Sequence, residues 1–214
     1  MNNKSLLWTC LLIIAGLGGA PGLHAADDAG WYAGAGVGRS DIKRASSWTQ
    51  VTDANLLARG LVSSTVIESH GTAWKLFGGY QFNENFAVEG GYHDLGRLKG
   101  LTVITAPAST LAGRWDASAA SVAVVGSYPV INRFAVFAKG GLALSRLTVG
   151  VPAPALYSPS ATRVQPLLGV GVKFDFMKSF GVRGEFERFN NVGDGSTTGQ
   201  SAVNVWSISA QYRF

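Results

Sequence analysis

Eight charged side chains stand in segments that are otherwise apolar or small, and they are the residues of this chain best suited to chemistry. Arg183, Glu185 and Glu187 show the spacing most clearly, since alternate residues of an extended segment share one face. Four of the eight are basic and four are acidic, so a common interior that received all of them would be nearly neutral. The full set is Lys75, Glu89, Lys139, Lys173, Asp175, Arg183, Glu185 and Glu187.

Three kinds of chemistry are open to such a set. Charges in a narrow interior must pair, because an unpaired buried charge is costly, and a paired network would fill space and fix the register of its strands. We take this structural plug as the first interpretation. The same pairs could instead gate a narrow path for ions or water by exchanging partners. A catalytic pair of carboxylates is the third alternative.

Other candidate sites are poorly supported. Glu68, Ser69 and His70 are the residue types of a hydrolytic triad, but neighbours in sequence do not converge on one substrate atom without special geometry. The glycine-rich segment 34–38 differs from a dinucleotide-binding motif in the position of its third glycine, and it lies in an expected strand. The acidic residues lack the spacing of a calcium loop. We therefore predict no catalytic residue, no cofactor and no metal site.

The interior charges need strands to position them, and eight alternating segments supply these. Each is about as long as a tilted membrane strand, roughly 9–11 residues plus some overhang. Apolar side chains such as Leu168, Val170 and Val172 occupy one face, while the other face is small or polar, the reverse of a soluble barrel. The pattern predicts an all-β, eight-stranded antiparallel up-and-down transmembrane β-barrel with strands near 30–41, 72–82, 86–95, 116–128, 134–145, 163–176, 180–189 and 203–214.

The connections between these segments alternate in length. The links at 83–85, 130–133 and 177–179 are short, and the other four are long, the first running from about 42 to 71. This alternation places both termini and all short turns on one side of a membrane and the long links on the other, as in outer-membrane barrels. Aromatic residues cluster at the short-turn ends, which predicts an interfacial girdle there.

The start of the chain has the features of an export signal. Lys4 precedes an apolar stretch over 6–17 and small residues follow, so we predict a signal peptide over 1–25, cleaved after Ala25 or, alternatively, Ala26. The barrel domain would then comprise residues 26–214, without Cys10 and hence without a disulfide. Charged residues make up 14% of the chain against roughly 25% in soluble proteins. The net charge of +5 is scattered and does not indicate nucleic-acid binding.

Several segments resemble a known family. WYAGAGVG at 31–38, EGGYHDLGR at 89–97, GVRGEF at 181–186, NNVGD at 190–194 and QYRF at 211–214 are similar to the OmpA transmembrane domain. The resemblance implies a monomeric structural protein of the bacterial outer membrane with at most weak pore activity. Lys173 stands where the family would have an acid, so the family's gating pair is not carried over.

The same resemblance suggests partners and leaves alternatives. We expect contact with outer-membrane lipid and lipopolysaccharide, and an unidentified partner of the long outer links. Tyr212 and Phe214 resemble the signal that the barrel-assembly machinery reads. A small porin and a lipid-modifying outer-membrane enzyme with dispersed catalytic residues are the alternative functions.

Overall fold

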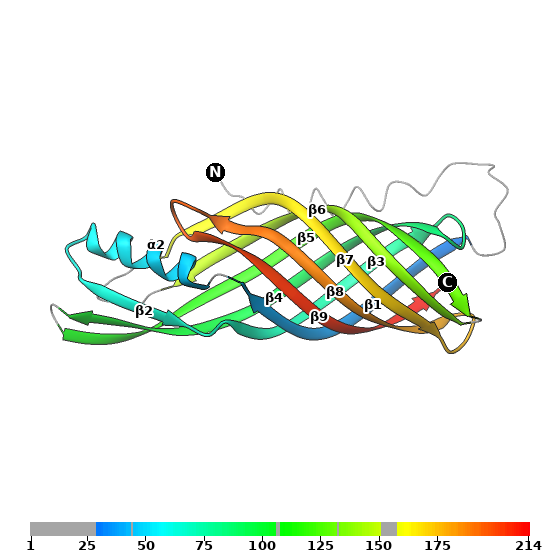
Figure 1. The fold of residues 1–214 in the computed structure, drawn as a ribbon, viewed down its shortest axis with the longest axis horizontal. Helices are drawn as coiled ribbons and strands as arrows, with labels where there is room; N and C mark the ends of the chain where they lie inside the picture. The colour runs from blue at the N-terminus through cyan, green and yellow to red at the C-terminus, as the bar shows by residue number, and fades with distance from the viewer. Residues whose placement is uncertain (1–28, 44, 106–107, 132, 151–157) are drawn as a thin grey trace.

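A computed structural model describes residues 29–43, 45–105, 108–131, 133–150 and 158–214 (Figure 1). The predicted signal peptide therefore lies outside the described residues. The described chain is almost entirely extended, because its apolar residues recur with a period of two. Its elements are β1 (Gly30–Ile42), α2 (Ala45–Leu57), β2 (Ser63–Ile67), β3 (His70–Gln81), β4 (Phe86–Thr105), β5 (Ala108–Ile131), β6 (Phe134–Gly150), β7 (Ser160–Asp175), β8 (Phe180–Asp194) and β9 (Gly199–Arg213).

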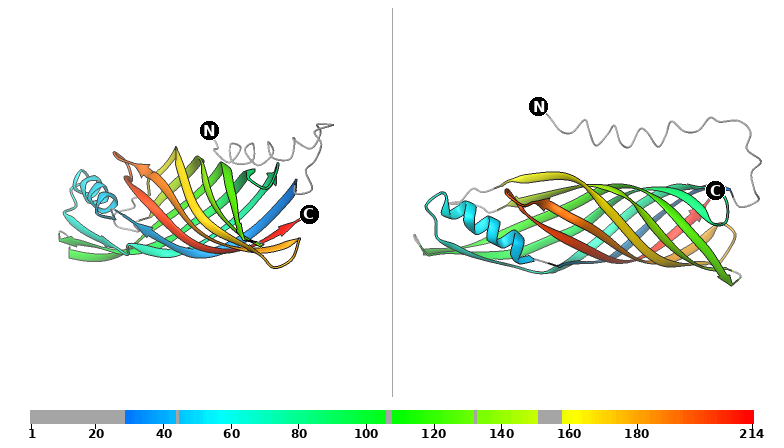
Figure 2. Two further views of the ribbon diagram at one scale, coloured as in Figure 1. Left: turned by 45° about the vertical axis from the view of Figure 1, so that its right-hand side comes forward. Right: turned by 45° about the horizontal axis from the view of Figure 1, so that its top comes forward.

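Eight of the strands close into a ring. Every strand pair is antiparallel, β1 pairs with both β3 and β9, and the pairing of β4 with β5 completes the circle. The predicted eight-stranded barrel is therefore confirmed. The remaining strand, β2, adds to β4 outside the ring. Both β2 and α2 lie at the end of the barrel that is away from the C-terminus (Figures 1 and 2).

The outer surface of the ring is apolar over its middle. Alternation exposes one side chain in two, so Val170 is 55% exposed while its neighbours Gly169 and Gly171 face inward. Aromatic side chains pack on each other at the short-turn end. The ring centres of Trp31 and Tyr80 lie 5.2 Å apart, and those of Phe174 and Phe176 lie 4.9 Å apart. This is the apolar band and aromatic girdle of a membrane barrel. No helix in the described ranges is long and apolar enough to cross a membrane.

The short turns are closed locally, as their length predicts. In the turn after β3, the Asn83 side-chain oxygen accepts hydrogen bonds from the backbone N–H groups of Asn85 and Phe86 at 2.9 and 2.8 Å. In the turn after β7, Met177 and Phe180 exchange backbone hydrogen bonds at 3.1 and 3.3 Å. These turns leave little chain on that side of the barrel.

The second long link is not a loop, and here the sequence prediction was wrong. We expected a connection over about 96–115, but β4 continues to Thr105 and β5 begins at Ala108, so the two strands form one long hairpin. The cause is a bulge between Asp94 and Gly96, where Gly96 has a φ of 97°. A bulge adds one residue and exchanges the two faces, so the alternation resumes with opposite parity.

The first long link is also structured, which its composition did not predict. It forms α2 and β2, and α2 packs close to β9 because Gly199 has no side chain there. A Cβ at Gly199, whose φ is 77°, would meet backbone atoms of Ser47 and Trp48. Asp53 on α2 accepts a hydrogen bond from the Thr65 backbone N–H at 3.0 Å, which caps the free edge of β2.

The turn between β8 and β9 shows how the outer end is held. The Asp194 carboxylate accepts hydrogen bonds from the backbone N–H and hydroxyl of Ser196 at 3.0 and 2.6 Å. These hydrogen bonds favour the ionised carboxylate and so hold the pKa of Asp194 below its ordinary value. Asp194 therefore stays ionised in mildly acidic medium, and the hydrogen bonds that close the turn are kept there.

Two arginine substitutions on β7 test the depth of the apolar band. Val170→Arg should lower the free energy of unfolding by about 2–4 kcal/mol, the cost of a cation near the bilayer mid-plane, whereas Val164→Arg should cost about 0–1 kcal/mol. Both valines face outward, but Val164 pairs with Leu144 near the outer end of the band. Reversible urea unfolding in lipid vesicles measures both. Equal costs would contradict the assigned depth.

Candidate functional site: the barrel interior

The inward side chains of the strands form three layers from the short-turn end to the outer end. A polar cavity comes first, a cluster of ion pairs comes next, and an apolar plug closes the outer end. Strand β8 shows the order of the last two layers. From the short-turn end toward the outer end, its inward side chains are Arg183, Glu185 and Glu187, and then Phe189. Each layer is described in turn.

Six of the eight predicted interior charges gather in the middle layer. Lys139 is its centre, and its Nζ lies 3.2 Å from Glu89, 2.6 Å from Glu185 and 2.7 Å from Glu187. Lys75 contacts the same two acids of β8, with Glu187 at 2.8 Å. These side chains are at most 4% exposed. Strands that do not neighbour each other supply them, so the pairs cross the lumen.

Arg183 closes the layer on the short-turn side. One of its Nη atoms lies 2.6 Å from Glu89 and the other 3.4 Å from Glu185. Its guanidinium also lies 4.6 Å from the ring centre of Phe77 and 4.4 Å from that of Phe137. Arginine is suited to this place, because its planar group stacks on rings while its edge pairs with carboxylates.

Sequence reasoning missed two polar members of this layer. The Tyr32 hydroxyl donates to Glu89 at 3.1 Å. His93 Nδ1 lies 3.7 Å from Glu187, and His93 Nε2 is 2.9 Å from the Ser121 hydroxyl. The sequence did allow His93 to be predicted as inward-facing. It follows Glu89 by four residues on the same strand, and residues an even number apart on a strand face the same side.

The other two predicted charges do not join the cluster. Lys173 and Asp175 form a separate pair at 3.3 Å, with side chains 14% and 33% exposed. They line a cavity of about 510 Å³ at the short-turn end, together with Gln81, Glu84, Arg133 and Arg213. Arg213 donates to Gln81 at 3.0 Å across this mouth. The cavity ends at the buried side chains of Phe77, Ala87, Val125 and Phe137, which lie between it and the ion pairs.

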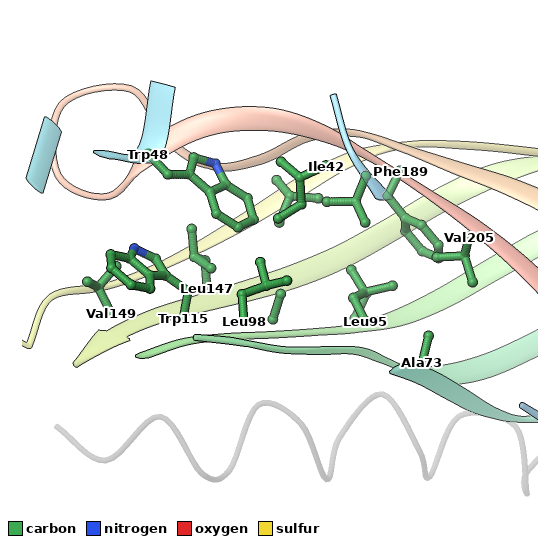
Figure 3. Close-up of a cluster of buried hydrophobic side chains, with 14 of the residues drawn as sticks. Ile42, Trp48, Ala73, Leu95, Leu98, Trp115, Leu147, Val149, Phe189 and Val205 are labelled. Atoms are coloured by element: carbon green, nitrogen blue, oxygen red, sulfur yellow. The ribbon is translucent and has the colours of Figure 1, made fainter. Parts of the chain in front are cut away.

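The outer layer contradicts the expectation that inward positions are small or polar along the whole barrel. Trp48 and Trp115 lie at one end of an apolar cluster, and Phe189 and Val205 lie toward the other (Figure 3). Trp48 comes from α2, which thereby covers the outer mouth. The polar-inside rule fails here because this part of the interior is packed like a soluble core.

Tyr212 and Phe214, the expected assembly signal, face outward in the girdle. Their rings lie 5.2 Å apart, and Phe214 is 79% exposed. Recognition by the assembly machinery stays a prediction.

The chemical capacity of the interior follows from its contacts. The middle layer holds three bases and three acids, so its formal charges balance. Each acid is held by at least two bases, an arrangement that stabilises ionised carboxylates rather than freeing one to act on a substrate. Within the described ranges, no three His, Cys, Asp or Glu side chains are grouped to hold a metal ion.

A closed eight-stranded ring with an apolar exterior and a filled interior defines a small outer-membrane β-barrel. Comparison with known families narrows this class. Residues 26–214 match the OmpA-like transmembrane domain, and the chain belongs to this family. Membership in this family places the chain in the bacterial outer membrane.

Relatives in sequence agree with this assignment. Outer membrane protein A of Serratia marcescens is 30% identical over 197 residues, and that of Shigella flexneri is 28% identical over 189 residues. Each alignment covers 86% of this chain but 49% and 48% of the relative, so the chain spans about half the length of these relatives.

Solved structures agree on the fold. Neisserial surface protein A is 13% identical, covers 86% of this chain and 97% of its own, and has a TM-score of 0.54. The N-terminal β-barrel domain of Pseudomonas aeruginosa OprF is 9% identical, covers 86% and 98%, and has a TM-score of 0.52. At these identities the likeness concerns the fold alone.

Proposed function

We propose that this chain is a structural, non-enzymatic and non-conducting barrel of the outer membrane, which contributes to envelope integrity and to surface contacts. One observation carries the proposal: each level of the interior above the short-turn cavity is occupied by paired charges or packed apolar side chains. An eight-stranded bore is only wide enough for side chains, so such filling leaves no continuous aqueous path.

Membership in the OmpA-like family supports a structural role, and an outer-membrane location suggests which molecules the barrel contacts. Outer-membrane lipid, lipopolysaccharide and the barrel-assembly machinery are the proposed partners, with export directed by the signal peptide over residues 1–25. The absence of catalysis is part of the proposal, and its support is that the acids of the middle layer are engaged by bases.

A small porin is the second candidate, and the cavity of about 510 Å³ at the short-turn end favours it. This cavity could be the vestibule of a path that opens when ion pairs exchange partners. The two candidates differ in whether the unmodified protein conducts.

Planar-bilayer recording of the refolded chain tests the proposal. We expect no steady conductance, because the ion-pair layer and the apolar plug each block the lumen. A variant in which a Gly/Ser linker replaces α2 should also stay closed, since the ion-pair layer lies beneath the missing helix. Steady single-channel currents from the unmodified chain would overturn the plug in favour of a porin.

A further inference from the structure

The outer surface of the barrel carries a basic cluster on three neighbouring strands. Asp116 on β5 lies between two arginines, with Arg97 Nε at 2.7 Å and Arg114 Nε at 2.9 Å. Lys99 stands opposite Arg114 in the β4–β5 pairing, and Arg146 stands opposite Ser118 in the β5–β6 pairing. All four bases are exposed. We call these five residues the Asp116 cluster.

The cluster carries excess positive charge that the protein itself does not balance. Asp94, which acts electrostatically on Arg97, and Glu68, whose backbone N–H donates to the Lys99 carbonyl at 3.0 Å, are the other nearby acids, so four bases face three acids. Lys99 and Arg114 are like charges placed opposite each other, an arrangement that is unfavourable without an anion. In the ion pairs of the described residues, neither Lys99 nor Arg146 has an acidic partner.

Two outward bases elsewhere on the ring are not grouped with other bases. Arg39 on β1 has its own acid, with Asp41 at 3.5 Å, and Arg188 on β8 donates to the neutral Asn190 at 2.9 Å and stands opposite Leu168 and Asn204. The face formed by β4, β5 and β6 instead brings four bases together.

The cluster lies directly above the apolar band. On β5 the outward residues below Ser118 are Ala120, Val122, Val124 and Gly126, and then Tyr128 of the girdle. About twelve residues separate Asp116 from Tyr128, roughly 30 Å along the axis for a tilted strand, against an apolar band about 25 Å tall. The charges thus stand at the level of the outer-leaflet headgroups.

We propose that the Asp116 cluster binds the phosphate groups of a phosphorylated glycolipid anchored in the outer leaflet. Arginine pairs with phosphate through two parallel hydrogen bonds, and Arg97 and Arg114 use Nε on Asp116, which leaves their Nη groups for a ligand. Asp116 is a positioning residue that holds the two guanidinium groups side by side. A lipid ligand, rather than a free anion, fits because the apolar band begins just below the charges.

Binding of lipid A, a bisphosphorylated diglucosamine lipid, to the refolded chain in neutral detergent tests this inference. The test variant is Arg97→Gln/Lys99→Gln/Arg146→Gln, which keeps Arg114 as the partner of Asp116. Its affinity for lipid A should fall at least tenfold, whereas Arg39→Gln should change it less than twofold. Dephosphorylated lipid A should bind the unmodified chain at least tenfold more weakly, and added salt should weaken the binding of intact lipid A.

Three outcomes would overturn the inference. Equal affinity of the triple variant and Arg39→Gln would show that the cluster is not the site. Inorganic phosphate binding as tightly as lipid A would indicate a free anion, and a heparin fragment binding more tightly than lipid A would indicate a soluble polyanion. The inference rests on the proposed function, in which the chain is a structural barrel that contacts outer-membrane lipid. Conductance is recorded separately, so a lipid-binding failure and a failure of the non-conducting plug are distinguishable.

Discussion

Replacing Glu185 by glutamine should lower the free energy of unfolding by about 3–5 kcal/mol, the cost of removing one member of a buried charge network. The carboxylate contacts Lys75, Lys139 at 2.6 Å and Arg183 at 3.4 Å, and its side chain is fully buried. Glutamine has nearly the volume of glutamate, so the lost stability would reflect the lost charge alone. The three bases of the middle layer would then have two acids as partners. Urea unfolding in lipid vesicles is the measurement.

The matched control lies on β7. Asp175→Asn also removes a carboxylate from an inward-facing ion pair, but this pair is partly exposed at the cavity, so its loss should cost at most about 1 kcal/mol. Single-channel recording of Glu185→Gln separates the plug from a gate. A plug that loses one charge stays closed or leaks slightly, whereas a gate opens far more often. Equal destabilisation by both substitutions would show that the middle layer is not desolvated.

The side that each charge faces could be predicted from the sequence, but its partner could not. A period of two is a local rule, so the spacing of Arg183, Glu185 and Glu187 was enough to turn them together to one face. Lys75 meets Glu185 across the lumen, however, and β3 is separated from β8 by β1 and β9. Such a contact depends on ring closure and strand stagger, which no short segment encodes.

The outer end could not be predicted for two local reasons. The bulge at Gly96 reverses the parity of β4, so the alternation seemed to stop where the strand in fact continues. In α2 the buried residues Trp48, Thr52 and Leu56 recur every four positions, but the polar Thr52 interrupts the apolar stripe. The Thr52 hydroxyl is satisfied inside the helix, where it donates to the Trp48 carbonyl at 2.9 Å.

The structured outer end leads to the second large expected effect. Trp48→Ala should remove about 3–5 kcal/mol from the docking of α2, because the fully buried indole is replaced by a cavity. The barrel itself should keep its fold, since the strands remain hydrogen-bonded around the ring and the loss falls on a peripheral unit. Amide hydrogen exchange should therefore accelerate over residues 45–57 and in β2, and not in β8.

A control on the same helix makes this result decisive. Leu57 is 60% exposed, so Leu57→Ala should leave exchange in α2 nearly unchanged, while Leu56→Ala, at a fully buried neighbour, should cost about 2–5 kcal/mol. Unchanged protection of α2 in Trp48→Ala would mean that the helix does not depend on the apolar plug. If the cap undocks and the variant still does not conduct, the ion-pair layer alone is enough to close the barrel, because Lys139 and its three acids lie below the level that the helix covers.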